Sequence, residues 1–255
     1  MKLPLIIAAR MGSSRLPGKT LMKINGREML GMIIDRVKKS KYVGEIILST
    51  THLNEDDQLI NWANNEGILS FRGDSLDLLK RIADTVNHFK LNSFIEVLGD
   101  NPLIDNKIID ITCEKFLSDS YDYVSILTKE YPKFCNSDSN VFPVGIRAQV
   151  MSSIALKKAS NQAKKDSYRE HPTTYIIDNP DKFIIGLIEA KDQFSDLNCK
   201  DYTFAVNVKA NLEMIRYIVN KLNKNNDNWD LTDVINLTKN DEYILSLMGN
   251  EAIFK

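Results

Sequence analysis

Short apolar runs alternate with amphipathic segments along the N-terminal part of the chain. The apolar runs predict buried strands at residues 5–9, 45–49, 68–71 and 94–98. Between them, apolar residues recur at the spacing of a helix face, which predicts helices at 29–39, 56–65 and 76–90. Strands that alternate with helices need right-handed crossovers, so the pattern predicts an α/β fold with a mainly parallel sheet and helices on both faces.

After residue 120 the alternation becomes less regular. The pattern predicts strands at 121–127, 140–151, 183–188 and 203–206, and helices at 152–165, 167–178, 212–222 and 231–239. Pro172 lies inside the second of these helices and is expected to interrupt it. No repeat or linker-like stretch divides the sequence, so we expect residues 1–255 to form a single domain with an inserted segment near 121–150.

Composition narrows the classes of function. The chain has 33 lysines and arginines and 34 aspartates and glutamates, a balance that does not favour binding to nucleic acid. Its three cysteines show no ligand spacing, which indicates free thiols in a reducing compartment, without a disulfide framework or structural zinc. The sequence shows neither a signal peptide nor an apolar run of about 18 residues, so a cytoplasmic protein with no membrane partner is expected.

A local group of cations nevertheless follows the first predicted strand. Residues 6–26 read IIAARMGSSRLPGKTLMKING, and their cations are Arg10, Arg15, Lys19 and Lys23. Ligands bind beyond the C-terminal ends of parallel strands, where a turn rich in glycine and serine exposes N–H groups that hold phosphate oxygens. The spacing matches neither the P-loop nor the dinucleotide-binding motif. A solvated loop is the alternative, but the small residues between the cations favour a phosphate site.

The same stretch resembles the N-terminal signature of the CTP-using acylneuraminate and 3-deoxy-octulosonate cytidylyltransferases, and most closely their spore-coat polysaccharide branch. The resemblance continues in order through FRGDSLDLLKR (71–81), LGDNPLID (98–105), YREHPTTYIIDNP (168–180) and FAVNVKANLEMI (204–215). It implies a Rossmann-like, three-layer nucleotide-diphospho-sugar transferase fold, Mg²⁺ as cofactor and a homodimer. The implied reaction transfers CMP from CTP to an acidic or modified sugar, with release of pyrophosphate, for surface polysaccharide synthesis.

The resemblance also assigns roles to residues. It implies nucleotide binding by Ala8, Ala9, Arg10, Met11, Gly12, Ser13, Ser14, Arg15, Lys19, Arg72 and Asp74. Lys19 and Arg15 would stabilise the leaving pyrophosphate and would act with Asp100 in catalysis. The acceptor would contact Arg169, His171 and Tyr175, although this motif suits packing or capping at a helix start equally well.

Asp100 follows a predicted strand, where its carboxylate suits either a helix N-cap or a magnesium ligand. The flanking motif resembles the metal motif of the family and favours a ligand role for Asp100 and a capping role for Asp105. Relatives carry a second acidic ligand where this chain has Asn207, and a further acidic residue where it has Asn211. An amide oxygen can bind Mg²⁺, but it brings no formal charge.

Acidic residues of the family are also replaced at Val144 and Arg147. These changes leave three hypotheses open. The first is an active cytidylyltransferase with Asp100 and Asn207 as metal ligands. The second is a nucleotide-binding homologue with a weakened metal site and little catalysis. The third is a nucleotidyltransferase that uses a non-sugar acceptor.

Overall fold

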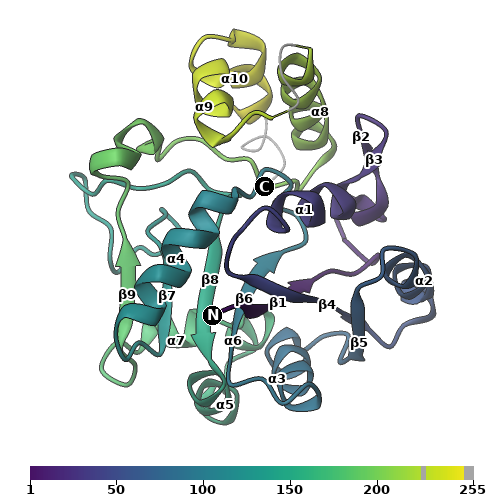
Figure 1. Ribbon diagram of the computed structural model, residues 1–255, viewed down its shortest axis with the longest axis vertical. Coiled ribbons are helices and arrows are strands. Elements are labelled where there is room, and N and C mark those ends of the chain that lie inside the picture. The colour runs from purple at the N-terminus through teal and green to yellow at the C-terminus, as the bar shows by residue number, and fades with distance from the viewer. Residues whose placement is uncertain (225–227, 250–255) are drawn as a thin grey trace.

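A seven-stranded sheet with the order β5-β4-β1-β6-β8-β7-β9 is the centre of the computed structural model, which describes residues 1–224 and 228–249 (Figure 1). Its strands are β1 (Leu3–Ala8), β4 (Val43–Thr51), β5 (Leu69–Gly73), β6 (Ser93–Leu98), β7 (Tyr123–Ile126), β8 (Ala148–Ser152) and β9 (Ile185–Ile188). The strands from β5 to β6 pair in parallel, whereas β8 is antiparallel to both of its neighbours. A small hairpin, β2 (Lys23–Ile24) and β3 (Arg27–Glu28), stands apart from this sheet.

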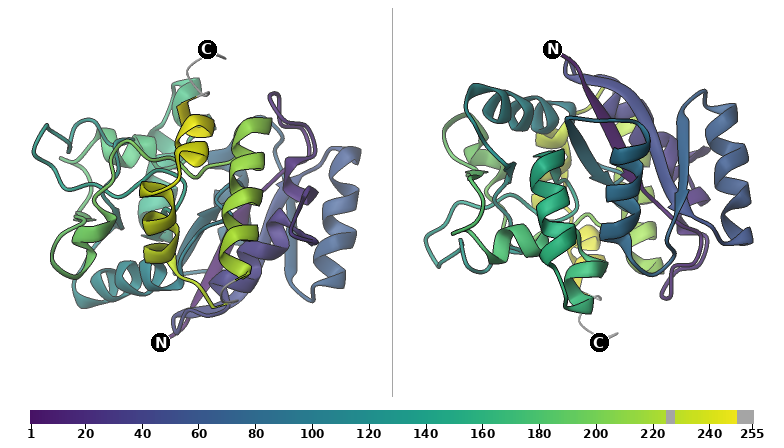
Figure 2. Two further views of the ribbon diagram at one scale, coloured as in Figure 1. Left: turned by 90° about the horizontal axis from the view of Figure 1, so that it is seen from above. Right: turned by 90° about the horizontal axis from the view of Figure 1, so that it is seen from below.

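Helices cover both faces of the sheet, as the views from above and below show (Figure 2). One face packs against α1 (Met29–Val37), α2 (Asp57–Asn65), α4 (Asn106–Ser118), α8 (Lys209–Asn223), α9 (Leu231–Lys239) and α10 (Glu242–Gly249). The other packs against α3 (Leu78–His88), α5 (Ser153–Gln162), α6 (Asp166–Glu170) and α7 (Thr174–Asp178). Side chains alternate along β1, so Leu5 and Ile7 enter the first core and Ile6 enters the second. The predicted three-layer α/β architecture is therefore confirmed. Among the described residues, no helix is long and apolar enough to cross a bilayer.

The C-terminal half departs from the predicted elements at several points. The predicted helix at 167–178 is interrupted at Pro172, as expected, and forms α6 and α7. The strand predicted at 140–151 was wrong in extent, because only β8 forms. Pro143 cannot donate a ladder hydrogen bond and Gly145 has φ 90°. The strand predicted at 203–206 was also wrong, since only Thr203 forms an isolated bridge, with Val144.

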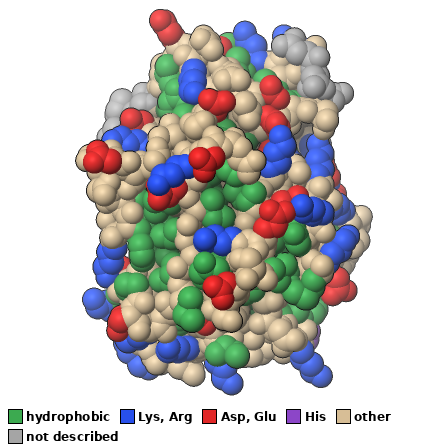
Figure 3. Space-filling view, turned by 60° about the vertical axis from the view of Figure 1, so that its left-hand side comes forward, with side chains coloured by type: hydrophobic (Ala, Val, Ile, Leu, Met, Phe, Trp, Pro, Cys, Tyr) green, Lys and Arg blue, Asp and Glu red, His purple; other side chains and the backbone are tan. Residues whose placement is uncertain are grey.

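The segment near 121–150 contributes β7 and most of β8 to the main sheet, and residues 127–147 connect them. Beyond β7, strand β9 forms one edge of the sheet. The space-filling view that brings this side forward shows hydrophobic side chains gathered across the middle of the face (Figure 3). Ile184, just before β9, is 58% exposed. This edge is thus a candidate contact surface.

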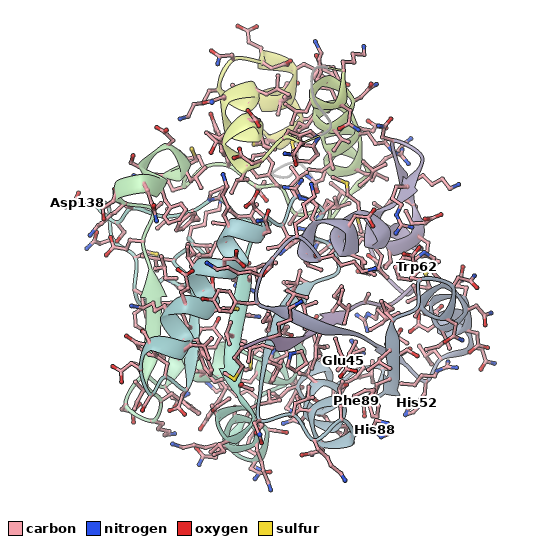
Figure 4. All side chains as sticks on the ribbon, viewed as in Figure 1. Glu45, His52, Trp62, His88, Phe89 and Asp138 are labelled. Atoms are coloured by element: carbon pink, nitrogen blue, oxygen red, sulfur yellow. The ribbon has the colours of Figure 1, made fainter. Side chains whose placement is uncertain are left out.

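Two of the histidines lie at the other edge of the molecule (Figure 4). The His88 ring, at the end of α3, packs against Phe71 and Phe89 with centroid distances of 5.3 and 4.7 Å. His52 follows β4. Neither of them lines the cavities described below.

Candidate active site

The loop that follows β1 is held in place by backbone contacts. The Met11 N–H donates to the buried carboxylate of Asp56 at 2.7 Å, and the Met11 carbonyl accepts from the Gly18 N–H at 2.9 Å. Gly18 has φ 73°, a left-handed conformation that glycine adopts without steric cost, and a short 3₁₀ helix, Lys19–Leu21, starts directly after it. The buried Thr20 hydroxyl donates to a carbonyl on the opposite side of the loop at 3.0 Å. The loop therefore presents Lys19 in a fixed position.

Lys19 joins three distant segments of the chain. Its Nζ donates to Asp100 Oδ2 at 3.0 Å and to the Val206 carbonyl at 2.6 Å, and the Val206 N–H donates to the Asp100 carbonyl at 2.9 Å. Gly99 allows this approach, because a Cβ there would lie 2.8 Å from the carbonyl oxygen of Ala8. The ends of β1 and β6 thus meet at one point, with the basic loop on one side and the Asp100 carboxylate on the other.

A cavity of about 300 Å³ opens at these strand ends. Its lining includes most of the predicted site residues: Ala8, Ala9, Arg10, Ser13, Ser14, Arg15, Lys19, Asp100, His171 and Asn207. It also includes residues to which the sequence assigned no role: Thr20, Ser75, Leu76, Leu78, Arg81, Leu98, Gly99 and Glu170. The loop, the metal candidates and the start of the acceptor motif therefore share one cavity.

Four predicted nucleotide-binding residues lie behind the lining. Met11 anchors the loop, and a side chain in place of Gly12 would collide with the Glu55 carboxylate. Arg72 donates to two backbone carbonyls at and after the end of β4, at 2.9 and 2.7 Å. Asp74 accepts from two N–H groups of the following turn, which lowers the pKa of its carboxyl. Met11, Arg72 and Asp74 hold the segments that carry the lining, Gly12 is exposed, and direct contact with a nucleotide stays a prediction for all four.

Arg81 is the main nucleotide-site candidate that was missed. It is 4% exposed, lines the cavity from α3 and donates through Nη1 to the Asp74 carbonyl at 2.8 Å. Burial and the charge of Arg10 lower its pKa to about 10, so the guanidinium is charged at neutral pH. Its Nε has no hydrogen-bond partner among the described residues. A buried cation with a free N–H is suited to an anionic phosphate. The sequence feature that could have identified Arg81 is its position as a basic residue on the inward face of a predicted helix.

Of the three predicted acceptor residues, Arg169, His171 and Tyr175, only His171 lines the cavity. Arg169 Nη2 forms an ion pair with Asp77 at 2.6 Å, and Tyr175, only 6% exposed, donates to Gln162 at 3.0 Å. Neither residue lines a cavity described here, which is what the packing alternative expects. His171, in contrast, lines both cavities of the site.

The metal candidates present two hard oxygen donors to the same cavity, the Asp100 carboxylate and the Asn207 amide. Mg²⁺ in nucleotide sites commonly takes one or two carboxylates and completes its shell with phosphates and water. These residues therefore fit a magnesium ion held jointly with a bound nucleotide. Among the described residues, no group of three His, Cys, Asp or Glu could hold a metal without such help.

The neighbouring polar residues have structural roles. Asn211 Oδ1 accepts from the N–H groups of Asn207 and Val208 at 3.0 Å each, and so fixes the segment that leads into α8. Asp105 accepts from the Lys107 N–H at 2.8 Å as the N-cap of α4, and the predicted capping role of Asp105 is confirmed.

A second cavity of about 390 Å³ adjoins the first and shares Leu78, Leu98 and His171 with it. Its remaining lining comes from β6, from β8 and the residues before it, from the loop after β7, and from α7 and its approach: Glu96, Glu130, Tyr131, Pro132, Lys133, Arg147, Gln149, Pro172, Thr173, Thr174, Ile177 and Asp178. Glu96 is fully buried, and burial raises its pKa from 4.5 to about 7.

Glu96 predicts a pH dependence of stability. A carboxyl group whose pKa is higher in the folded than in the unfolded protein destabilises the fold as the pH rises through that interval. Relative to Glu96→Gln, the wild-type free energy of unfolding is expected to fall by on the order of 3 kcal/mol between pH 4.5 and 8. Urea unfolding of both proteins across this range measures the difference. Parallel pH profiles would contradict the assignment.

Comparisons with known proteins identify the family and agree with the fold. The family model described as Cytidylyltransferase matches residues 5–209. An uncharacterized protein of Methanocaldococcus jannaschii is 32% identical over 236 residues, which cover 88% of this chain and 92% of that protein. The spore coat polysaccharide biosynthesis protein SpsF of Bacillus subtilis is 28% identical over 227 residues, covering 87% and 88%. The solved structure of a cytidylyltransferase from Leptospira borgpetersenii superposes with a TM-score of 0.83 at 25% identity over 96% of both chains.

Proposed function

This chain belongs to the cytidylyltransferase family, and from that premise we propose that it transfers CMP from CTP to an acidic or modified sugar with release of pyrophosphate. The observation that carries the proposal is the 3.0 Å contact between Lys19 Nζ in the basic loop and the Asp100 carboxylate. It joins the phosphate-binding and metal-binding candidates in one cavity. The similarity to a spore coat polysaccharide biosynthesis protein supports a role in surface polysaccharide synthesis.

The residues of the first cavity suit the steps of this reaction. The backbone near Ala9 would face the cytosine, and Arg10, Ser13 and Arg81 would hold the triphosphate. An acceptor hydroxyl oxygen would attack the α-phosphorus and pass its proton to water, while the bond from the α-phosphorus to the oxygen that bridges it to the β-phosphorus breaks and pyrophosphate leaves. Lys19, with Arg15, would stabilise the negative charge that develops on the leaving group.

Asp100 and Asn207 would hold Mg²⁺ in this site. When bound, the ion supplies charge neutralisation for the phosphate oxygens. Lys19, in ion-pair contact with the Asp100 carboxylate, adds a positive charge beside it.

The second cavity suits the acceptor. It adjoins the nucleotide cavity through His171, and its volume of about 390 Å³ accommodates a single sugar. We also propose that the protein acts in the cytoplasm, where CTP is available, and that it forms a homodimer. The hydrophobic face beside β9 supports the dimer (Figure 3).

The test follows pyrophosphate release with each of the four nucleoside triphosphates, a panel of acidic and amino sugars, and Mg²⁺. Release that depends on CTP, on a sugar and on Mg²⁺ is expected. Absence of release with every combination would overturn the proposal.

Asn207→Asp tests the alternative of a nucleotide-binding homologue, which the uncharged amide at this position favours. A second carboxylate is expected to lower the Mg²⁺ concentration for half-maximal rate, because formal charge strengthens ion binding. The matched control is Asn64→Asp, which adds the same charge at an exposed position on α2. If the wild type binds CTP in a thermal-shift assay without turnover and Asn207→Asp gains turnover, the homologue hypothesis holds.

A further inference from the structure

The charged side chains of the second cavity are paired except for one. Arg147 Nη1 lies 3.2 Å from Glu130 Oε2, and Lys133 Nζ lies 3.4 Å from Asp178 Oδ1. Glu96 forms no ion pair with any described residue, although it is fully buried. The cavity therefore holds one buried carboxyl group that forms no ion pair with a described residue.

The orientation of Glu96 is fixed by a chain of hydrogen bonds from the neighbouring strands. The Tyr123 hydroxyl, which also contacts the Tyr131 hydroxyl at 2.7 Å, donates to Gln149 Oε1 at 2.5 Å. That acceptor assignment leaves Gln149 Nε2 to donate to Glu96 Oε2, at 2.7 Å. Gln149 is thus committed to one carboxylate oxygen, and the other oxygen, Oε1, has no partner among the described residues.

Arg147 presents a complementary free group beside it. Its guanidinium is bonded to Glu130 through Nη1 and lies 5.3 Å from the centre of the Tyr131 ring, while the buried Nε has no described partner. Buried polar atoms are normally hydrogen-bonded, so these two unpartnered atoms in one cavity suit a ligand that completes both. That ligand donates to Glu96 and accepts from Arg147.

We propose that Glu96 and Arg147 select an acceptor sugar that carries an amino group. The ammonium donates to Glu96 Oε1 and balances its charge, and a hydroxyl or carboxylate oxygen of the same sugar accepts from Arg147 Nε. This inference rests on the proposed function, since it names the acceptor class of that reaction. It assigns Glu96 a role in specificity.

The surroundings of Glu96 favour an amine over a hydroxyl. The charged groups that face it are Arg147, before β8, and Arg81, on α3. Arg147 already pairs with Glu130, and Arg81 lines the nucleotide cavity, where phosphate is its expected partner. An ammonium forms a charge-assisted hydrogen bond with a buried carboxylate, which is roughly twice as strong as a neutral one.

The experiment compares pairs of acceptors that differ by one substitution. Sugar acids and their analogues with an amine in place of one hydroxyl, at each position in turn, are assayed for pyrophosphate release with CTP. For one position, the amino analogue is expected to have a KM lower by about tenfold or more, the equivalent of one charged hydrogen bond. Glu96→Gln is expected to bring the two KM values within about twofold with little change in kcat.

Two further variants complete the design. Arg147→Lys removes Nε and is expected to raise the KM of both acceptors while preserving their ratio. Glu45→Gln removes a carboxylate from an exposed position on β4 and is the matched control, expected to match the wild type (Figure 4). Equal KM values for all pairs in the wild type, or an unchanged preference in Glu96→Gln, would overturn the inference and leave the proposed function intact.

A binding measurement tests the amino-sugar preference even if the proposed reaction does not occur. If no acceptor supports pyrophosphate release, the same pairs are compared by thermal shift in the presence of CTP. An amino sugar that raises the Tm of the wild type but not of Glu96→Gln supports the inference without turnover. The absence of any such difference counts against it.

Discussion

Lys19→Ala is expected to reduce kcat/KM for pyrophosphate release by about 10²–10³-fold, as removal of a cation that stabilises developing charge does in other enzymes. The Lys19 ammonium is the group that touches both the Asp100 carboxylate and the Val206 carbonyl. Its loss removes positive charge from the leaving-group side of the cavity and leaves Asp100 facing the triphosphate. Steady-state kinetics with CTP and Mg²⁺ measure the effect.

The matched control is Lys23→Ala, in the same basic stretch. Lys23 is exposed on β2 and does not line the cavity, so its removal is expected to change kcat/KM by less than about twofold. Thermal unfolding of Lys19→Ala checks that the fold persists. An active Lys19→Ala enzyme would remove the phosphate role assigned to this residue.

Asp105→Ala is expected to lower the free energy of unfolding by about 3–5 kcal/mol, because it leaves a buried cation without its partner. Asp105 caps α4, accepts from the Leu231 N–H at 3.2 Å and lies 3.4 Å from Arg36 Nη2. Arg36 is 8% exposed and stacks 4.2 Å from the centre of the Trp229 ring. Burial lowers the pKa of Arg36, and the charges of Asp105 and Asp230 oppose that shift.

Ser152→Ala is the control for the capping part of this effect. Ser152 caps α5 through a bond from the Ala155 N–H at 3.1 Å and pairs with no cation, so its loss is expected to cost about 1 kcal/mol. Urea unfolding measures both variants. Equal losses in the two would mean that the Arg36 pair contributes nothing beyond a helix cap.

The regular half of the fold could be predicted because β1, β4 and β6 are largely buried on both faces and read as continuous apolar runs. The failure at residues 203–206 has a physical reason. Phe204 and Val206 are fully buried, but the Val206 N–H donates to the Asp100 carbonyl, outside any sheet ladder. An apolar run predicts burial, but it does not predict which groups the backbone hydrogen bonds join. Helix α4 was overlooked although Ile109, Cys113 and Phe116 have helical spacing.

The candidate site also contains residues that could be predicted from the sequence and residues that could not. The basic loop could be predicted because its glycines, serines and cations lie in one short stretch. Arg169 could not be placed, because its partner Asp77 lies 92 residues away. Glu96 gave no signal within the apolar run FIEVL, since its surroundings depend on Gln149 in β8 and on Arg147 just before it. Residues whose role comes from tertiary neighbours need the fold before they can be interpreted.

The three-way junction at Lys19 has a consequence for how the protein is made. Its partners lie 81 and 187 residues further along the chain. During translation the parallel strands from β1 to β6 emerge first and can pair, but the carbonyl that completes the junction is synthesised more than 100 residues after Asp100. A nascent chain or a fragment that stops before residue 206 therefore carries the basic loop without its final anchor. The Lys19 junction is therefore completed only once residue 206 has been synthesised.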